Sequence, residues 1–285
     1  MRQSTQNWVY MRYFIATINE LCGILKNNQQ HRQHNMKKII PILILLLTTV
    51  DGFSKCASSG LYFWPTKQTI NQNSIFVIDG YATSQKIING LGTTYKVYLK
   101  SDKQKIKLNV QELLVGQFSL TQAILKPETT LSVGQEYELV IENLDDLETQ
   151  VYRYNDSTRQ REKIKWTVKN FNDTTSPTWT SNPKFKNSSY NMYGCGPAIF
   201  ANFTYSAADN SKYLIKTTVK NKSTGIETTY YLKPDDKVIA IGHGMCSGAF
   251  NFDGGDKFEV EFSLFDASGN LTKWTGERIE FKRPT

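Results

Sequence analysis

Apolar and polar residues alternate along most of the chain after residue 55, and this pattern predicts β-strands. The cleanest run is residues 258–264, in which phenylalanine, valine and leucine alternate with glutamate and serine. The same period of two recurs at residues 106–110 and 164–168, and less regularly at 137–141. Strands of this kind bury one face and expose the other, which is typical of antiparallel sheets.

Shorter apolar segments predict further strands, and glycine-rich or polar turn signals separate them. The additional strands are expected over residues 75–78, 95–99, 117–120, 198–205, 213–219, 227–232, 238–241 and 278–281. The turn signals lie at residues 79–80, 101–102, 224–225, 253–256 and 268–270. No convincing amphipathic helix follows residue 55, and the nearest candidate, residues 142–151, is short and acidic. This arrangement favours sandwiches over a parallel α/β sheet.

A polar segment that ends in proline, residues 172–177, divides the alternating region into two parts. Each part has about 100 residues, the usual size of an immunoglobulin-like sandwich. We therefore predict an all-β protein with two tandem antiparallel immunoglobulin-like β-sandwiches, at residues 55–171 and 178–285, joined by the linker 172–177. The second of these is expected to hold a disulfide.

The segment 36–54 has the three parts of a secretory signal peptide. Met36-Lys37-Lys38 is basic, residues 39–50 are apolar, and small residues follow at 52–54. A membrane span needs about 20 apolar residues, so this run is too short to anchor the chain. We expect export to the periplasm, cell envelope or exterior, with a mature chain that begins near Lys55. Residues 1–35 fit no part of this pattern and are interpreted as a gene-start error or a disordered extension.

The net charge of +8 does not indicate a nucleic-acid surface. Residues 1–54 hold six Lys or Arg and two acidic residues, which leaves a net charge of +4 on the expected mature chain. Its lysines are scattered along the strands, whereas a nucleic-acid footprint is a concentrated basic patch.

The first half resembles a bacterial immunoglobulin-like module of the type found in surface-layer proteins. The resemblance is carried by Pro65 and by residues 73–79, then by 125–127 and 137–141, with Leu131 and Gly134 between them. The Gly-Ala turn usual after the opening proline is replaced here by residues 66–69. The second half resembles a fibronectin-III or immunoglobulin-like fold through its pattern and its Asp-Thr-Thr-Ser-Pro opening. The resemblance of the first half implies a non-enzymatic spacer or binding module.

Three cysteines remain after export: Cys56, Cys195 and Cys246. An exported protein meets an oxidising compartment, so pairing is the default. Cys195 and Cys246 have similar glycine-rich settings, and we predict a disulfide between them. Cys56 pairing with either of them, or carrying a lipid, stays open.

His243 is the one histidine after the signal peptide, so a Ser-His-Asp or Cys-His site would have to use it. With Met245 it offers an imidazole and a thioether, which suit copper. The favoured interpretation is nevertheless a tight glycine-bracketed turn that needs positive φ, with the methionine packed beneath it. Paired acids such as 253 and 256 lie in turn-like contexts, where carboxylates usually bond the local backbone.

We therefore predict an exported, non-enzymatic cell-envelope or extracellular protein of binding or structural role, with no cofactor and with a protein or glycan as partner. The alternatives are a copper-handling sandwich that uses His243 and Met245, and a secreted hydrolase with an unrecognised site. Four tryptophans could form a sugar-stacking platform, although packing in a core is favoured: Trp64, Trp166, Trp179 and Trp274.

Overall fold

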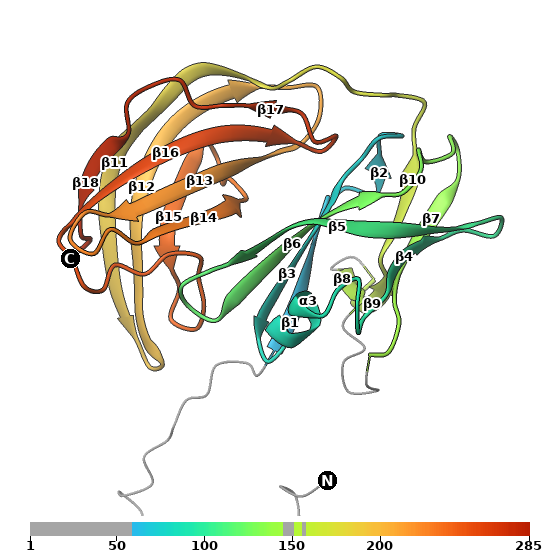
Figure 1. Cartoon of the computed structure of the whole chain (residues 1–285), viewed down its shortest axis with the longest axis horizontal. Helices are drawn as coiled ribbons and strands as arrows, with labels where there is room; N and C mark the ends of the chain where they lie inside the picture. Colours follow the sequence, from blue (N-terminus) through green and yellow to red (C-terminus); the bar gives the residue numbers. More distant parts are fainter. Residues whose placement is uncertain (1–58, 145–150, 156–157) are drawn as a thin grey trace, which may run out of the picture. The chain divides into compact units, whose positions relative to one another are not determined.

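The protein is all-β, as the alternation predicted, in a computed structural model that describes residues 59–144, 151–155 and 158–285 (Figure 1). The predicted signal peptide, the interpretation of residues 1–35 and Cys56 lie outside the described residues. Among the residues described, one short helix accompanies the strands, α3 (Gln85–Asn89). It is not long and apolar enough to cross a membrane.

The first half of the described chain forms one eight-stranded sheet. In order of pairing its strands are β1 (Ser59–Trp64), β3 (Phe76–Ala82), β6 (Leu120–Pro127), β5 (Lys105–Val115), β4 (Val97–Lys100), β7 (Glu136–Ile141), β10 (Lys165–Val168) and β2 (Thr69–Ile70). All neighbours are antiparallel except β2 and β10, which run parallel. The strand β5 pairs with β4 through residues 105–107 and with β6 through residues 108–115, so that the sheet curls on itself.

The curl encloses a core of its own, here called the curled-sheet core. It includes Phe76, Ile78, Leu99, Ile106, Leu108, Leu125, Tyr137, Leu139, Trp166 and Val168, together with Ile87 and Ile88 of α3. The indole of Trp166 packs edge-on against Phe76 and donates a hydrogen bond to the Pro65 carbonyl oxygen at 3.0 Å. The interpretation of Trp166 as a core residue is confirmed.

The second half forms two sheets. One has the order β11 (Thr178–Tyr193), β12 (Gly196–Ala208) and β15 (Val238–His243). The other has the order β14 (Glu227–Leu232), β13 (Tyr213–Asn221), β16 (Lys257–Asp266) and β17 (Leu271–Thr272), with β18 (Ile279–Lys282) also paired to β16. Burial alternates strictly along β16, as its sequence predicted.

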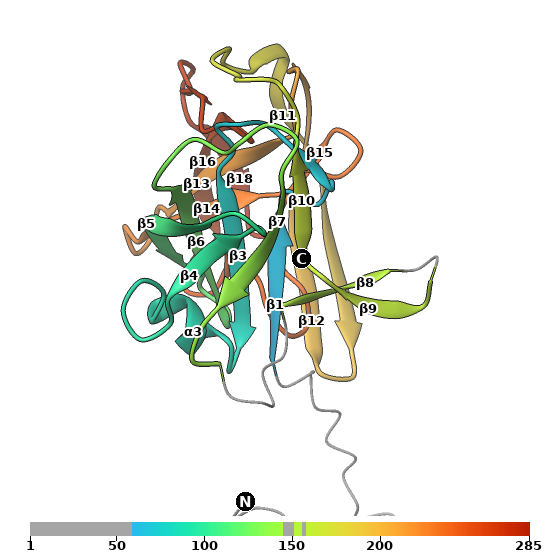
Figure 2. The same ribbon diagram turned by 90° about the vertical axis from the view of Figure 1, so that its right-hand side faces the viewer.

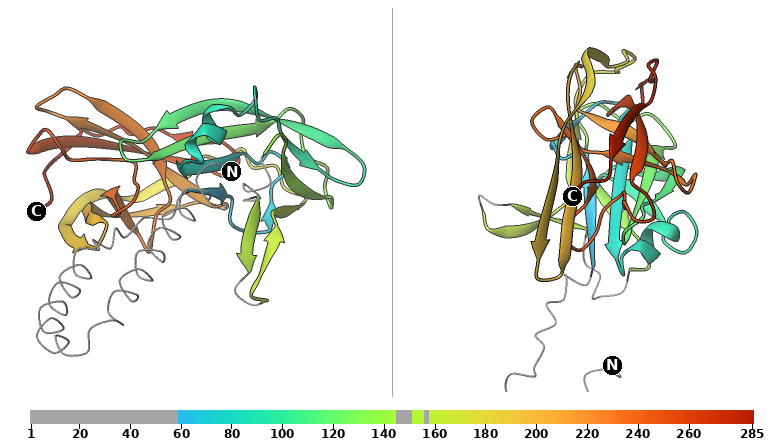
Figure 3. Two further views of the ribbon diagram at one scale, coloured as in Figure 1. Left: turned by 90° about the horizontal axis from the view of Figure 1, so that it is seen from below. Right: turned by 90° about the vertical axis from the view of Figure 1, so that its left-hand side faces the viewer.

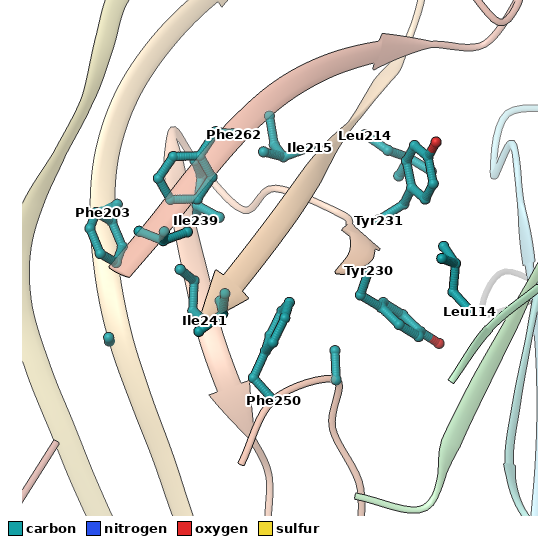
Figure 4. Packing of buried hydrophobic residues seen from close by; sticks show 14 of the residues in the cluster. Leu114, Phe203, Leu214, Ile215, Tyr230, Tyr231, Ile239, Ile241, Phe250 and Phe262 are labelled. Atoms are coloured by element: carbon teal, nitrogen blue, oxygen red, sulfur yellow. The ribbon is translucent and has the colours of Figure 1, made fainter. Parts of the chain in front are cut away.

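Side chains of both these sheets meet in a second core, here called the shared core (Figure 4). Phe203 of this core has no exposed surface, and its ring contacts those of Phe185, Phe262 and Phe281. Burying a side chain of this size stabilises the fold by about 1.5–3 kcal/mol. The same core also takes residues of the first half: Trp64, Ile75, Val77, Leu114 and Ile124. The core is therefore continuous across residues 172–177.

The strand β3 explains how one sheet serves two cores. Phe76 and Ile78 enter the curled-sheet core, whereas Val77 on the opposite face enters the shared core. Successive side chains of a strand point to opposite faces, so a strand buried on both faces has an unbroken apolar run. Residues 75–78 are such a run, and the strand predicted there is confirmed.

Several features differ from the sequence-based expectation. The strand predicted at 117–120 is wrong, because only Leu120 lies in a strand, as the first residue of β6. Asp79-Gly80 is not a turn but lies inside β3, where a Cβ on Gly80 would stand 2.4 Å from Ile88. The strand β11 was not predicted, because it is polar and mostly exposed and shows no alternation. The hairpin of β8 (Tyr152–Asn155) and β9 (Gln160–Lys163), visible beside the main sheets in Figure 2 and Figure 3, was not predicted either.

Candidate functional site

A cavity of about 530 Å³ lies where the first half meets β13 and β14. Its walls are largely apolar and aromatic, and a few polar groups converge on it, which is the usual make-up of a small-molecule site. The apolar walls come from Leu61, Phe63, Trp64, Val77, Ile164 and Leu214. The polar groups belong to Thr66, Asp79, Gln122 and Lys233.

Asp79 is the acidic group of this cavity. Its Oδ1 accepts hydrogen bonds from the hydroxyl of Tyr230 at 2.6 Å and from Nε2 of Gln122 at 2.9 Å. Both donors are buried, and Tyr230 comes from β14, 151 residues further along the chain. In Figure 4 the rings of Tyr230 and Tyr231 extend away from β14 with their hydroxyl oxygens at the far ends. The carboxylate is thus held in one orientation from two strands.

The amide of Gln122 joins the two halves through the backbone of Tyr231. Its Nε2 donates to the Tyr231 carbonyl oxygen at 3.0 Å, and its Oε1 accepts from the Tyr231 amide at 3.1 Å. The side chain of Gln122 therefore makes the two backbone hydrogen bonds that a neighbouring strand would otherwise make with Tyr231 of β14. Every polar atom of the amide is used, as burial requires.

Burial raises the pKa of Asp79 to about 6, because the charged form loses hydration, while the hydrogen bonds from Tyr230 and Gln122 oppose the rise. The side chain of Asp79 lines the cavity and keeps some exposed surface there, so the residue as a whole is half-buried. Burial likewise raises the pKa of the Tyr230 hydroxyl, and the neighbouring Asp79 raises it further. At neutral pH the cavity thus presents a fixed carboxylate beside neutral phenols.

Tyr62 on β1 and Tyr152 on β8 line the same cavity with much of their rings open to solvent, at 61% and 40% exposure. Six aromatic side chains are exposed among the residues described, and Tyr62 and Tyr152 are the two of them that line this cavity. Exposed aromatic faces beside a cavity are stacking surfaces for a ligand.

A second polar group supports Tyr231, which also lines the cavity. Its hydroxyl donates to Oε2 of Glu112 at 3.0 Å, and Lys216 forms an ion pair with Glu112 at 3.4 Å. The Lys216 ammonium also lies 5.2 Å from the centre of the Tyr231 ring. Burial raises the pKa of the Tyr231 hydroxyl, and the charge of Glu112 adds to the rise. These contacts fix the ring of Tyr231 at the cavity wall.

The structure places the predicted site residues elsewhere. His243 ends β15, is 5% exposed, and packs its ring 4.8 Å from that of Phe118. Its Nδ1 lies 2.8 Å from the Gly244 carbonyl oxygen, and because a carbonyl only accepts, Nδ1 carries the proton. Met245 is 39% exposed, so the expectation that it packs beneath the turn is wrong. The alternatives of a copper site on His243 and Met245 and of a hydrolase that uses His243 stay predictions.

The glycine-rich segments that carry the cysteines do meet. Ile199 of β12 pairs with His243 of β15, and a Cβ on Gly196 would lie 3.7 Å from the Met245 carbonyl oxygen. No disulfide joins the two cysteines that the structure describes, Cys195 and Cys246. Neighbouring backbone segments are not enough, because a disulfide also needs a narrow Cβ separation and direction. The alternative pairing with Cys56 involves a residue outside the described ranges.

The tryptophans fall into two groups. Trp166 is in the curled-sheet core, and Trp179 and Trp274 pack edge-to-face at 6.4 Å against the shared core. Trp64 is buried but reaches the cavity. Sequence reasoning thus named one residue of the site and missed the tyrosines and Asp79. The signal for Asp79 was present, since an acid directly follows the unbroken apolar run of a doubly buried strand.

Comparisons with known proteins add little to this description. No protein-family model and no curated protein matches the chain. Solved structures with some similarity include a pullulanase from Anoxybacillus sp. LM18-11 complexed with maltotriose, with a TM-score of 0.23 and 10% identity over 79% of this chain and 25% of the enzyme. Pullulanase type I from Bacillus subtilis str. 168 complexed with maltose has a TM-score of 0.23 and 10% identity over 80% and 24%. The chain spans about a quarter of these enzymes, and the likeness is too weak to assign a fold or an activity.

Proposed function

We propose that the protein is an exported, non-enzymatic glycan-binding module of the cell envelope or exterior, and that the cavity between β1, β3 and β14 holds one or two sugar rings. Sugars have apolar ring faces that stack on aromatic side chains and hydroxyl rims that bond carboxylates and amides. The two immunoglobulin-like sandwiches predicted from the sequence belong to this proposal, as do the signal peptide and export.

One observation carries the proposal: two exposed tyrosines, Tyr62 and Tyr152, flank a cavity that contains the fixed carboxylate of Asp79. A protein partner usually requires a broad contact of about 800 Å² per side. A concave site with stacking rings and a few oriented polar groups instead suits a small polar ligand. This contrast favours a glycan over a protein partner.

The test is a glycan array followed by titration calorimetry with the best oligosaccharide. We expect Tyr62→Ala and Tyr152→Ala each to weaken binding about tenfold, which corresponds to about 1.4 kcal/mol for one lost stacking contact. Tyr190→Ala is the matched control, because this tyrosine on β11 is 44% exposed and does not line the cavity. The control should bind like the wild type.

Two results would contradict the proposal. One is no binding to any glycan on the array, and the other is binding that Tyr190→Ala reduces as much as the two cavity variants do. The proposal also requires the bound oligosaccharide to remain intact, which mass spectrometry after prolonged incubation measures. Cleavage that Asp79→Asn abolishes would identify a hydrolase instead.

A further inference from the structure

Three carboxylates from distant parts of the chain meet at one point. Asp173 belongs to the segment between β10 and β11, Asp209 directly follows β12, and Asp266 is the last residue of β16. One oxygen of each lies within 4.8 Å of the others. Asp173 and Asp266 are 1% and 0% exposed, and Asp209 is half-buried. Like charges at such distances repel strongly when water is excluded.

The described part of the chain supplies no ion-pair partner for this cluster, although Lys169 and Lys212 line the same cavity as Asp209. None of the ion pairs among the described residues involves Asp173, Asp209 or Asp266. Buried charges are normally paired with an opposite charge or bound to a metal ion, and this cluster lacks such a partner among the described side chains.

The carboxylates are held in place by neutral donors. Oδ1 of Asp266 accepts from the backbone amides of Ser268 and Asn270, each at 2.8 Å, and its Oδ2 accepts from Nδ2 of Asn270 at 2.7 Å. Oδ2 of Asp209 accepts from the hydroxyl of Ser211 at 2.8 Å. Nδ2 of Asn270 also reaches the Asp173 carbonyl oxygen at 3.1 Å. These bonds orient the side chains without neutralising them.

One oxygen of the cluster has no partner at all. Oδ1 of Asp173 accepts from the Thr175 amide at 3.1 Å, whereas Oδ2 of Asp173 is fully buried and makes no hydrogen bond. It is one of two such side-chain atoms among the described residues, the other being Nε1 of Trp179. An unsatisfied buried carboxylate oxygen is rare and calls for a ligand.

We propose that Asp173, Asp209 and Asp266 bind a calcium ion. All three donors are carboxylates, which hard cations prefer, and no sulfur or imidazole is in the group. Calcium accepts ligands at about 2.3–2.6 Å, so oxygens that share one ion lie no more than about 5 Å apart. The three oxygens here meet this condition, because they lie within 4.8 Å of one another. Magnesium needs about 2.0–2.1 Å and a near-ideal octahedron, and it usually keeps several water ligands, so three protein carboxylates suit calcium better.

The ion would link three segments that are far apart in the sequence. It would join residues 172–177 to the ends of β12 and β16 and remove the repulsion between buried charges. Asp209 also lines a cavity of about 340 Å³, which offers the ion a route from solvent. The proposal is independent of glycan binding, because none of the three residues lines the cavity of Asp79.

The test is calorimetry of the full chain with calcium chloride. We expect one ion per chain, and a melting temperature about 5 °C higher in 5 mM calcium than in EDTA, as mass action predicts for a dissociation constant near 0.1 mM. The same concentration of magnesium chloride should produce a clearly smaller shift. No binding heat together with an unchanged melting temperature in calcium would overturn the proposal.

Two variants and one control locate the ion. Asp209→Asn changes the half-buried member and should abolish most of the calcium-dependent shift while the protein still folds, and Asp266→Asn should abolish it as well. The control is Asp102→Asn, an exposed acid in the turn between β4 and β5, which should keep the full shift. If Asp209→Asn and Asp266→Asn both retain the shift, the ion binds elsewhere and the proposal is wrong.

Discussion

Replacing Asp79 by asparagine is expected to raise the free energy of unfolding by up to about 3 kcal/mol at pH 7.5, because it removes a buried charge and keeps the shape of the side chain. Burial raises the pKa of this carboxyl from its ordinary value of 3.8 to about 6. A difference of this size corresponds to about 3 kcal/mol between the protonated and ionised forms. Asparagine keeps an oxygen that accepts from Tyr230 and Gln122, but it carries no charge.

The sign of the pH dependence follows from proton linkage. Because its pKa is raised in the folded state, Asp79 binds its proton more tightly there than in the unfolded chain. The wild type therefore loses stability as the pH rises from about 4 to about 6, and the loss is complete above 6. Below about 4 the carboxyl is protonated in both states, so the variant's advantage disappears.

Urea denaturation at pH 3.5, 5 and 7.5 measures this difference. The stability gained by Asp79→Asn should be near zero at pH 3.5, intermediate at pH 5 and largest at pH 7.5. Asp102→Asn, in an exposed turn, should show no such trend. If Asp79→Asn is less stable than the wild type at pH 7.5, the hydrogen bonds to the ionised carboxylate outweigh its burial, and the account of the cavity's electrostatics is wrong.

The Gly242→Ala variant is expected to lose about 2–4 kcal/mol more stability than Gly225→Ala. Gly242 pairs with Phe200 between β15 and β12 and has φ +147, and a Cβ there would stand 1.9 Å from the Ile199 carbonyl oxygen. Gly242 and Ile199 both lie in paired strands, so their backbones cannot move apart without breaking the hydrogen bonds between β15 and β12. We expect the variant to separate β15 from β12 locally and to expose part of the shared core.

Gly225 is the matched control because its φ is also positive, at +75, and no atom lies within 4 Å of its would-be Cβ. Its substitution tests the cost of the backbone conformation alone, about 1 kcal/mol. Thermal and urea unfolding of both variants measure the difference between steric and conformational costs. Equal losses would show that the close approach of β12 to Gly242 does not constrain this strand.

The positive φ predicted for the glycine-bracketed segment is found at Gly242. Backbone conformation does not explain every glycine of the segment, however, because close contacts require another of them. Gly248 has no unusual φ, and yet a Cβ on it would lie 2.3 Å from the Cα of His243. In this segment the backbone at Gly248 therefore passes close to that at His243, whose ring packs against Phe118. Short motifs of glycine, histidine and methionine do not distinguish such packing from a metal site.

The candidate site was hidden from sequence reasoning for a local reason. Asp-Gly is a common turn signal, and the pair at 79–80 was interpreted in that way, although it continues β3. The acid is tolerated inside a buried strand because Tyr230 and Gln122 supply hydrogen bonds from β14 and β6. The strand β11 was missed for the opposite reason, since it is held by pairing with β12 and hardly by burial of its own side chains.

By itself, the sequence determined the all-β class, most of the strands and most of the turns, because alternation records which face of a strand is buried and turn residues record local backbone needs. Only the tertiary structure decided that β3 serves two cores, that Asp79 meets Tyr230, and that Asp173, Asp209 and Asp266 converge. These contacts join residues far apart along the chain. They depend on the order in which strands pair and on how the sheet curls, and a local pattern of residues does not encode either.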